Sequence, residues 1–189
     1  MAARPVGGLL LTPGAGSNRD QSTLVAIEAA MAPWPVARVD FPYRKEGRRA
    51  PDRAPKLIES VVADATAFAR AARIRPSRLA LGGRSMGGRI CSMAVADGLP
   101  AAALVLIAYP LHPPGRPDKL RVEHLPRIEV PCLFVSGTRD AFGTPEELEA
   151  ATSAVAGPVT HHWIDRGGHD LKGHDPRVAS TVAGWLRSL

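Results

Sequence analysis

A serine between two glycines, in Gly83-Arg84-Ser85-Met86-Gly87, is the side chain of this sequence best placed for nucleophilic chemistry. The motif follows an apolar run at residues 78–82 and precedes a helical pattern at residues 86–96. A strand, a sharp turn and a helix in that order expose a serine hydroxyl, and the turn needs glycine on either side. The sequence therefore predicts that Ser85 is a nucleophile. The alternative is an ordinary glycine-rich turn in which Ser85 caps the helix.

A serine hydroxyl becomes a good nucleophile only when a base removes its proton, and the base in turn needs an acid to orient it. Asp140 follows the apolar run at residues 132–136, and His169 follows another at residues 160–164. The chain order serine, aspartate, histidine is that of one widespread group of serine hydrolases. We therefore expect Asp140 to be the acid and His169 the base, with His174 as the main rival for the base.

Acyl transfer also needs N–H donors for the oxyanion. The N–H of Met86, directly after the serine, is one expected donor. The second should come from the loop after the first strand, where Ala15 is the first choice and Gly16 the next. This glycine-rich loop contains neither of the two common phosphate-binding glycine motifs.

The elements that would position these residues form a repeating pattern. Short apolar runs alternate with helical patterns along the chain, which is typical of a parallel sheet covered by helices on both faces. The second run alternates polar Arg38 and Asp40 with apolar residues and predicts an edge strand. The expected strands are residues 8–12, 37–41, 78–82, 103–108, 132–136 and 160–164. The fold class predicted is α/β, with about six mostly parallel strands.

Helical patterns lie between these runs, with recognisable start and stop signals. Thr144 and Glu147 have the spacing of a capping box at the start of one helix. The expected helices cover residues 20–31, 57–73, 86–96, 144–155 and 175–189. Two stretches, residues 42–55 and 110–131, are expected to be irregular, and the second is a candidate for a partial cover over the site but is too short for a large lid.

The composition is that of one ordinary globular domain spanning residues 1–189. No apolar run approaches the length of a membrane span, and the apolar run near the N-terminus is too short for a secretory signal. Cys91 and Cys132 lie in apolar stretches and are expected to be reduced, unreactive core thiols of a cytoplasmic protein. No cluster with metal-ligand spacing is present, and we expect neither a metal nor a cofactor.

The formal net charge of +6 raises the question of an anionic partner. The only dense basic run is Arg44-Lys45-Glu46-Gly47-Arg48-Arg49, with Arg53 just beyond. It lacks the interleaved aromatic residues of a nucleic-acid platform, so no nucleic-acid partner is expected. A solvated loop is the simpler interpretation. If the loop borders the site, its arginines would attract esters that carry a carboxylate or phosphate.

Together, the segments Leu11–Gly16, Phe41–Arg44, Gly82–Arg89, Ser136–Asp140 and Gly168–His169 resemble the short α/β-hydrolase family of dienelactone-hydrolase-like proteins. That family includes the hydrolase-like domain of a histone-acetylation complex subunit and a testis-expressed relative. The resemblance implies a minimal α/β-hydrolase fold with Ser85, Asp140 and His169 as nucleophile, acid and base. The sequence departs from authentic dienelactone hydrolases, which carry a cysteine where this chain has Ser85.

Two functions remain open from the sequence. The first is a serine hydrolase that cleaves a small ester or thioester. Its reaction would pass through an acyl-enzyme intermediate. The second is an interaction domain that keeps the fold without catalysis, because one branch of the resembled family serves inside a chromatin complex. Neither the natural substrate nor the oligomeric state follows from the sequence.

Overall fold

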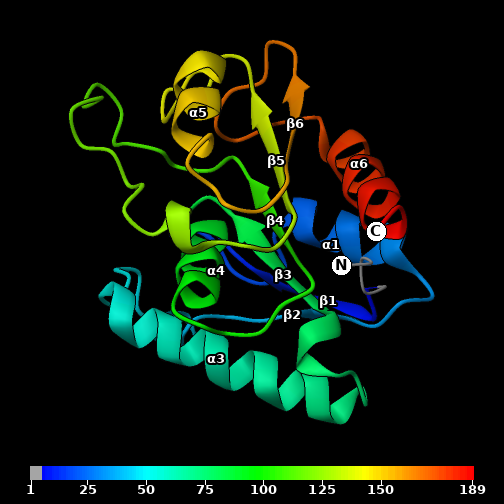
Figure 1. Cartoon of the computed structure of the whole chain (residues 1–189). Coiled ribbons are helices and arrows are strands. Elements are labelled where there is room, and N and C mark those ends of the chain that lie inside the picture. Colours follow the sequence, from blue (N-terminus) through cyan, green and yellow to red (C-terminus); the bar gives the residue numbers. More distant parts are fainter. Residues whose placement is uncertain (1–5) are drawn as a thin grey trace.

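The computed structural model describes residues 6–189, and these contain one six-stranded sheet (Figure 1). The strands are β1 (Gly8–Thr12), β2 (Val36–Arg38), β3 (Leu79–Arg84), β4 (Ala103–Ile107), β5 (Cys132–Gly137) and β6 (Val159–Ile164). Their spatial order is β2-β1-β3-β4-β5-β6, and every neighbouring pair is parallel. The predicted parallel α/β architecture is confirmed.

Helices cover both faces of the sheet because the central strands are apolar on both sides. The helices are α1 (Ser22–Met31), α2 (Pro42–Lys45), α3 (Ala54–Ala71), α4 (Met86–Ala96), α5 (Pro145–Thr152) and α6 (Asp175–Arg187), with short 3₁₀ turns at Pro76–Arg78 and Leu125–Arg127. On β1, Leu9 and Leu11 pack toward the α1 and α6 side, and Leu10 packs toward α3 and α4. Figure 1 shows α1 beside α6 on one face and α3 below the other.

The structure differs from the sequence prediction mainly around β2. This edge strand is shorter than expected, ending at Arg38, and the stretch predicted to be irregular begins with the short helix α2. Pro42 occupies the first turn of α2, where its missing N–H costs nothing, and Tyr43 is fully buried. Burial of Tyr43 therefore fixes a segment whose composition alone reads as a loop.

The carboxyl ends of all six parallel strands meet at one edge of the sheet. Within this edge, β1 and β3 approach so closely that a Cβ on Gly83 would overlap the carbonyl oxygen of Thr12. A Cβ on Gly87, at the start of α4, would meet the same oxygen and that of Pro13. Both glycines of the serine motif are thus required by contact with the end of β1, and Gly87 also by contact with the first residue of the loop that follows.

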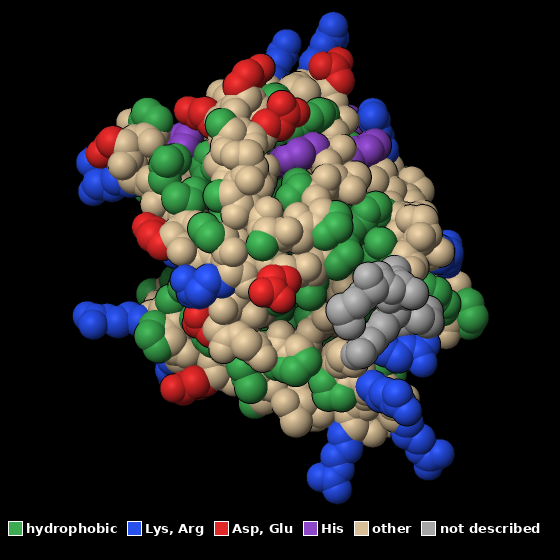
Figure 2. All heavy atoms as spheres, in the orientation of Figure 1, with side chains coloured by type: hydrophobic (Ala, Val, Ile, Leu, Met, Phe, Trp, Pro, Cys, Tyr) green, Lys and Arg blue, Asp and Glu red, His purple; other side chains and the backbone are tan. Residues whose placement is uncertain are grey.

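The remaining predictions about the whole molecule concern its cysteines and its surface. Cys91 and Cys132 are buried and unpaired, and burial raises the pKa of each thiol to about 12. Among residues 6–189, no helix is long and apolar enough to cross a membrane. Lys and Arg side chains are scattered over the face drawn in Figure 2, with Asp and Glu among them.

Candidate active site

Ser85 occupies the sharp turn between β3 and α4. Its φ of 50° and ψ of −119° are strained for a residue with a side chain, and such strain is concentrated at functional positions. The Ser85 N–H donates to the carbonyl of Ile107 on β4 at 2.8 Å, which anchors the turn to the sheet. The side chain is partly exposed and lies at the edge where the strands end.

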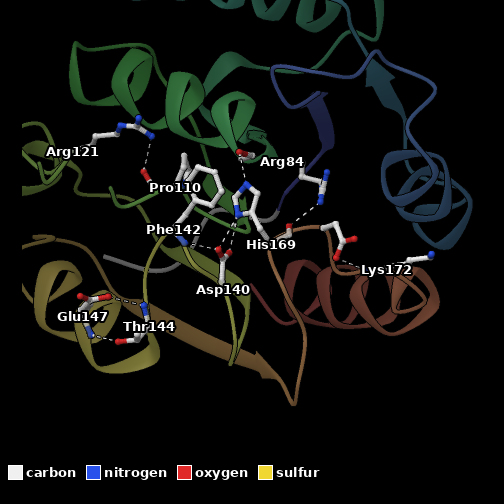
Figure 3. Close-up of polar contacts among 11 residues, drawn as sticks. Arg84, Pro110, Arg121, Asp140, Phe142, Thr144, Glu147, His169 and Lys172 are labelled. Carbon is white, nitrogen blue, oxygen red and sulfur yellow. Dashed lines mark hydrogen bonds and ion pairs between the residues drawn. The ribbon is translucent and has the colours of Figure 1, made fainter. Parts of the chain in front are cut away.

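The structure brings the three predicted side chains together. Ser85 Oγ lies 2.8 Å from His169 Nε2, and His169 Nδ1 lies 2.9 and 3.0 Å from the two carboxylate oxygens of Asp140 (Figure 3). Asp140 requires the proton on Nδ1, so Nε2 is left with a lone pair to accept the Ser85 hydroxyl. This direction of hydrogen bonding is the one that general-base removal of the serine proton needs.

Asp140 and His169 are held by neighbours that the sequence did not point to. Asp140 is only 4% exposed, and its carboxylate accepts the backbone N–H of Phe142 at 2.8 Å. The Phe142 ring stacks on the His169 imidazole, with ring centroids 3.9 Å apart. On the other side, Arg84 Nη2 donates to the carbonyl of His169 at 2.8 Å (Figure 3). The imidazole is therefore fixed through its ring, its Nδ1 and its backbone.

One expected oxyanion donor directly follows Ser85 in the chain, and the other lies in the loop that lines the pocket beside Ser85. Met86 is the first residue of α4, so its N–H has no partner within the helix. Ala15 lies in the loop after β1, and the buried Tyr43 hydroxyl donates to its carbonyl at 2.8 Å. No described residue accepts a hydrogen bond from the N–H of Ala15 or Met86. Tyr43 thus fixes the loop that carries the second predicted donor, a role the sequence did not indicate.

A pocket of about 450 Å³ opens beside Ser85. Its lining residues are Gly14, Ala15, Gly16, Ser17, Gln21, Arg84, Ser85 and His169. None of them belongs to the basic loop at residues 44–53. Within that loop, Arg48 is held by Glu46 and Asp52 at 2.6 and 2.9 Å. These contacts favour the interpretation of residues 44–53 as a solvated surface loop.

The rival histidine lies elsewhere. His174 is the N-cap residue of α6 and does not line the pocket, and no hydrogen bond joins it to Ser85 or Asp140 in the described part of the chain. His169 is therefore the histidine in position to serve Ser85. Within residues 6–189, no group of three or more His, Cys, Asp or Glu side chains is arranged to hold a metal ion.

Comparison with known proteins gives a family match and several structural neighbours. A family model described as an alpha/beta hydrolase domain matches residues 6–183. Est1E from Butyrivibrio proteoclasticus superposes with a TM-score of 0.78 at 14% identity, covering 96% of this chain and 87% of that one.

Two further solved structures are similar over nearly their whole length. A putative hydrolase of the alpha/beta superfamily from Xanthomonas campestris has a TM-score of 0.72 at 23% identity, covering 97% of this chain and 99% of that one. The type II thioesterase BorB from the borrelidin biosynthetic cluster has a TM-score of 0.68 at 21% identity, covering 98% and 96%. At these identities the likeness concerns the fold.

Proposed function

The chain belongs to the alpha/beta hydrolase family, and we propose that it is a serine hydrolase that cleaves a small ester or thioester through an acyl-enzyme. The observation that carries the proposal is the connected arrangement of Ser85, His169 and Asp140, with hydrogen-bond lengths of 2.8 to 3.0 Å at the mouth of a pocket. Nucleophile, base and orienting acid in hydrogen-bond contact are the parts that acyl transfer needs.

In the first half of the proposed reaction, His169 Nε2 takes the proton of Ser85 while Oγ attacks the carbonyl carbon of the substrate. Asp140 stabilises the imidazolium that forms. The negative charge that develops on the carbonyl oxygen is met by the N–H groups of Met86 and Ala15. Collapse of the tetrahedral intermediate breaks the bond to the alcohol or thiol, which leaves with the proton from His169.

In the second half, water enters the place of the leaving group. His169 removes a proton from that water, and the resulting hydroxide attacks the acyl carbon. The same two N–H groups hold the second oxyanion. When the acyl bond to Ser85 breaks, Oγ recovers its proton from His169, and the carboxylic acid is released.

The size of the pocket supports a small substrate, since about 450 Å³ lies near the lower end of the range for ligand sites. The structural neighbours include an esterase solved with ferulic acid bound and a type II thioesterase, so both oxygen and sulfur leaving groups belong in the test. The closer resemblance to dienelactone-hydrolase-like proteins remains a prediction from the sequence motifs.

The proposal is tested by steady-state kinetics on p-nitrophenyl esters and acyl thioesters of increasing chain length. We expect turnover that favours short chains and that disappears in Ser85→Ala, and we expect a burst of p-nitrophenol equal to the enzyme concentration if deacylation is slow. A folded protein that turns over no member of either series would instead support the interaction-domain alternative.

A further inference from the structure

Within the described part of the chain, Arg84 differs from several other arginines in having no carboxylate partner. Arg38, Arg48 and Arg127 each form a salt bridge with a carboxylate, at 2.6 to 2.9 Å. Arg84 forms none with any residue between 6 and 189. Its Nη2 donates to the His169 carbonyl, whereas its Nε is buried and has no hydrogen-bond partner. Arg89 shares the buried, unpartnered Nε but does not line the Ser85 pocket. A buried donor without a partner is costly, so it needs an explanation.

The surroundings of Arg84 leave its charge without a direct counterion. Burial lowers the pKa of this arginine, but a guanidinium stays protonated at any physiological pH. Asp170, Asp175 and Asp140 act on it electrostatically without forming a salt bridge. None of the residues that line the Ser85 pocket carries a carboxylate. The pocket therefore presents one cation, partly desolvated, directly beside the nucleophile.

Gln21 supplies a second unsatisfied polar group in the same pocket. It is the residue just before α1, and its Oε1 is buried without a hydrogen-bond partner. Gln21 and Arg84 are far apart in the sequence, yet both line this pocket and both have a buried polar atom without a hydrogen-bond partner. The Arg84 guanidinium is a donor and matches an anion, whereas the amide oxygen of Gln21 is an acceptor and would need a donor such as a hydroxyl.

We propose that Arg84 binds an anionic group of the substrate, so that the ester or thioester cleaved at Ser85 carries a carboxylate or a phosphate close to its scissile bond. This inference rests on the proposed hydrolase function and names its substrate class. A guanidinium recognises both anions by charge-assisted hydrogen bonds. The anion would contact Arg84 from the pocket that this side chain lines, while Nη2 keeps its bond to the His169 carbonyl.

The competing explanation is that Arg84 only positions His169 through its carbonyl. The two roles differ in what they do to the kinetics. Loss of a positioning contact lowers kcat for every ester alike, whereas loss of an anion contact raises KM for anionic esters alone. The ratio of kcat/KM between an anionic ester and a neutral ester of the same size separates the two.

The experiment compares two matched pairs of substrates. With the charge on the acyl side, the pair is 4-nitrophenyl hemisuccinate and 4-nitrophenyl pentanoate. With the charge on the alcohol side, the pair is 4-acetoxybenzoate and its methyl ester. For the wild type, we expect kcat/KM to favour the anionic member of at least one pair by about tenfold or more, as a charge-assisted hydrogen bond provides.

Arg84→Met should reduce that preference at least fivefold through KM, and Arg84→Lys should restore part of it. Arg49→Met is the matched control, because it removes an exposed arginine of the basic loop outside the pocket lining. It should leave the ratio unchanged. An equal fall in the ratio for Arg49→Met would show a long-range field and contradict the proposal.

Gln21→Glu gives a test that does not disturb the contact between Arg84 and His169. A carboxylate at this position would compete with the substrate anion for Arg84, so the anionic preference should fall. No preference for the anionic ester in either pair, or a ratio that survives Arg84→Met, overturns the inference while Ser85-dependent turnover of neutral esters still stands. Absence of turnover for every ester would refute the proposed function itself.

Discussion

Residues 6–189 contain two serine–histidine pairs with the same hydrogen-bond length, and only one of them is built like an active site. Ser85 Oγ lies 2.8 Å from His169 Nε2, and Ser92 Oγ lies 2.8 Å from His124 Nε2. The second pair joins α4 to the 3₁₀ turn that begins at Leu125. The hydrogen-bond distance alone therefore does not distinguish a nucleophile from a structural serine.

The third partner of each pair sets the direction in which the proton points. Asp140 takes the Nδ1 proton of His169, so Nε2 accepts from Ser85. Ser92 donates its own proton to the carbonyl of Arg89 at 2.7 Å, so His124 must be the donor in its bond with Ser92. His124 therefore cannot remove the Ser92 proton as the pair stands.

The two pairs also differ in their exposure to solvent. Ser92 is fully buried and His124 is 5% exposed, whereas Ser85 and His169 line a pocket. Burial, chiefly, with help from the charges of Arg89 and Arg127, lowers the pKa of His124 to about 4. An imidazole with so low a pKa is a weak base. The Ser85–His169 pair therefore differs from the Ser92–His124 pair in three ways. It lines a pocket, its histidine has a carboxylate partner, and a lone pair of that histidine faces the serine.

The largest expected effect is the loss of activity in Ser85→Ala. Removing the nucleophile should lower kcat at least about 10³-fold while leaving the fold intact, because a single oxygen is removed from a partly exposed side chain. Ser92→Ala is the matched control. It should keep kcat within about twofold and reduce the free energy of unfolding by roughly 1–3 kcal/mol, because it leaves a buried histidine donor unpaired. Comparable losses of activity in the two variants would show that Ser85 and Ser92 do not differ in function.

The second largest effect is expected from a change at the carboxylate of Asp140. Asp140→Asn should lower kcat about 10²- to 10⁴-fold, because an amide favours the wrong tautomer of His169. Asp170→Asn is the control, since Asp170 is an exposed carboxylate next to His169 in sequence and forms no hydrogen bond with its ring among the described residues. A small effect of Asp140→Asn on kcat would mean that the orientation of His169 does not depend on this carboxylate.

The aromatic ring over the base should matter less. Phe142→Leu should lower kcat roughly 3- to 10-fold, because the ring stabilises both the orientation of His169 and the imidazolium that forms during the reaction. The Phe142 N–H still donates to Asp140 in this variant, which isolates the contribution of the ring. Unchanged kcat would show that the contact with Asp140 suffices to position the imidazole.

The smallest effect on activity is expected from a change in the Ser92–His124 pair. There the quantity to measure is the free energy of unfolding as a function of pH. The folded state keeps His124 neutral down to about pH 4, whereas an ordinary histidine in the unfolded chain gains a proton below about 6.5. The free energy of unfolding should therefore fall as the pH is lowered from 7 toward 4. Urea unfolding at pH 7 and pH 5 should show a smaller decrease in His124→Gln than in the wild type. The same decrease in both proteins would contradict a buried neutral His124.

The features that could be predicted from the sequence are those that depend on local patterns of residues. The six strands follow from short apolar runs, and the capping box of α5 is formed as predicted, with Thr144 and Glu147 exchanging hydrogen bonds. The meeting of Ser85, Asp140 and His169 was expected because parallel strands end at one edge of the sheet. These inferences need only periodicity, chain order and the direction of strands.

What the sequence could not predict depends on how distant side chains pack. The stacking of Phe142 on His169, the support of Ala15 by Tyr43 and the pairing of Ser92 with His124 each join segments that no spacing rule connects. The sequence also directed attention to the arginines of residues 44–53, because they form a visible run. The arginine that lines the pocket is Arg84, which belongs to the serine motif and not to that run.

Labelling with a fluorophosphonate probe identifies the nucleophile, which we propose is Ser85. Trypsin cuts after Arg84 and after Arg89, so Ser85 and Ser92 fall in different peptides whose masses identify the labelled residue. We expect one label per native chain on the peptide of residues 85–89. The label should be kept in Ser92→Ala and absent from Ser85→Ala and from heat-unfolded protein. A native, folded wild-type protein that takes up no probe, or carries it on another residue, would show that Ser85 is not the nucleophile.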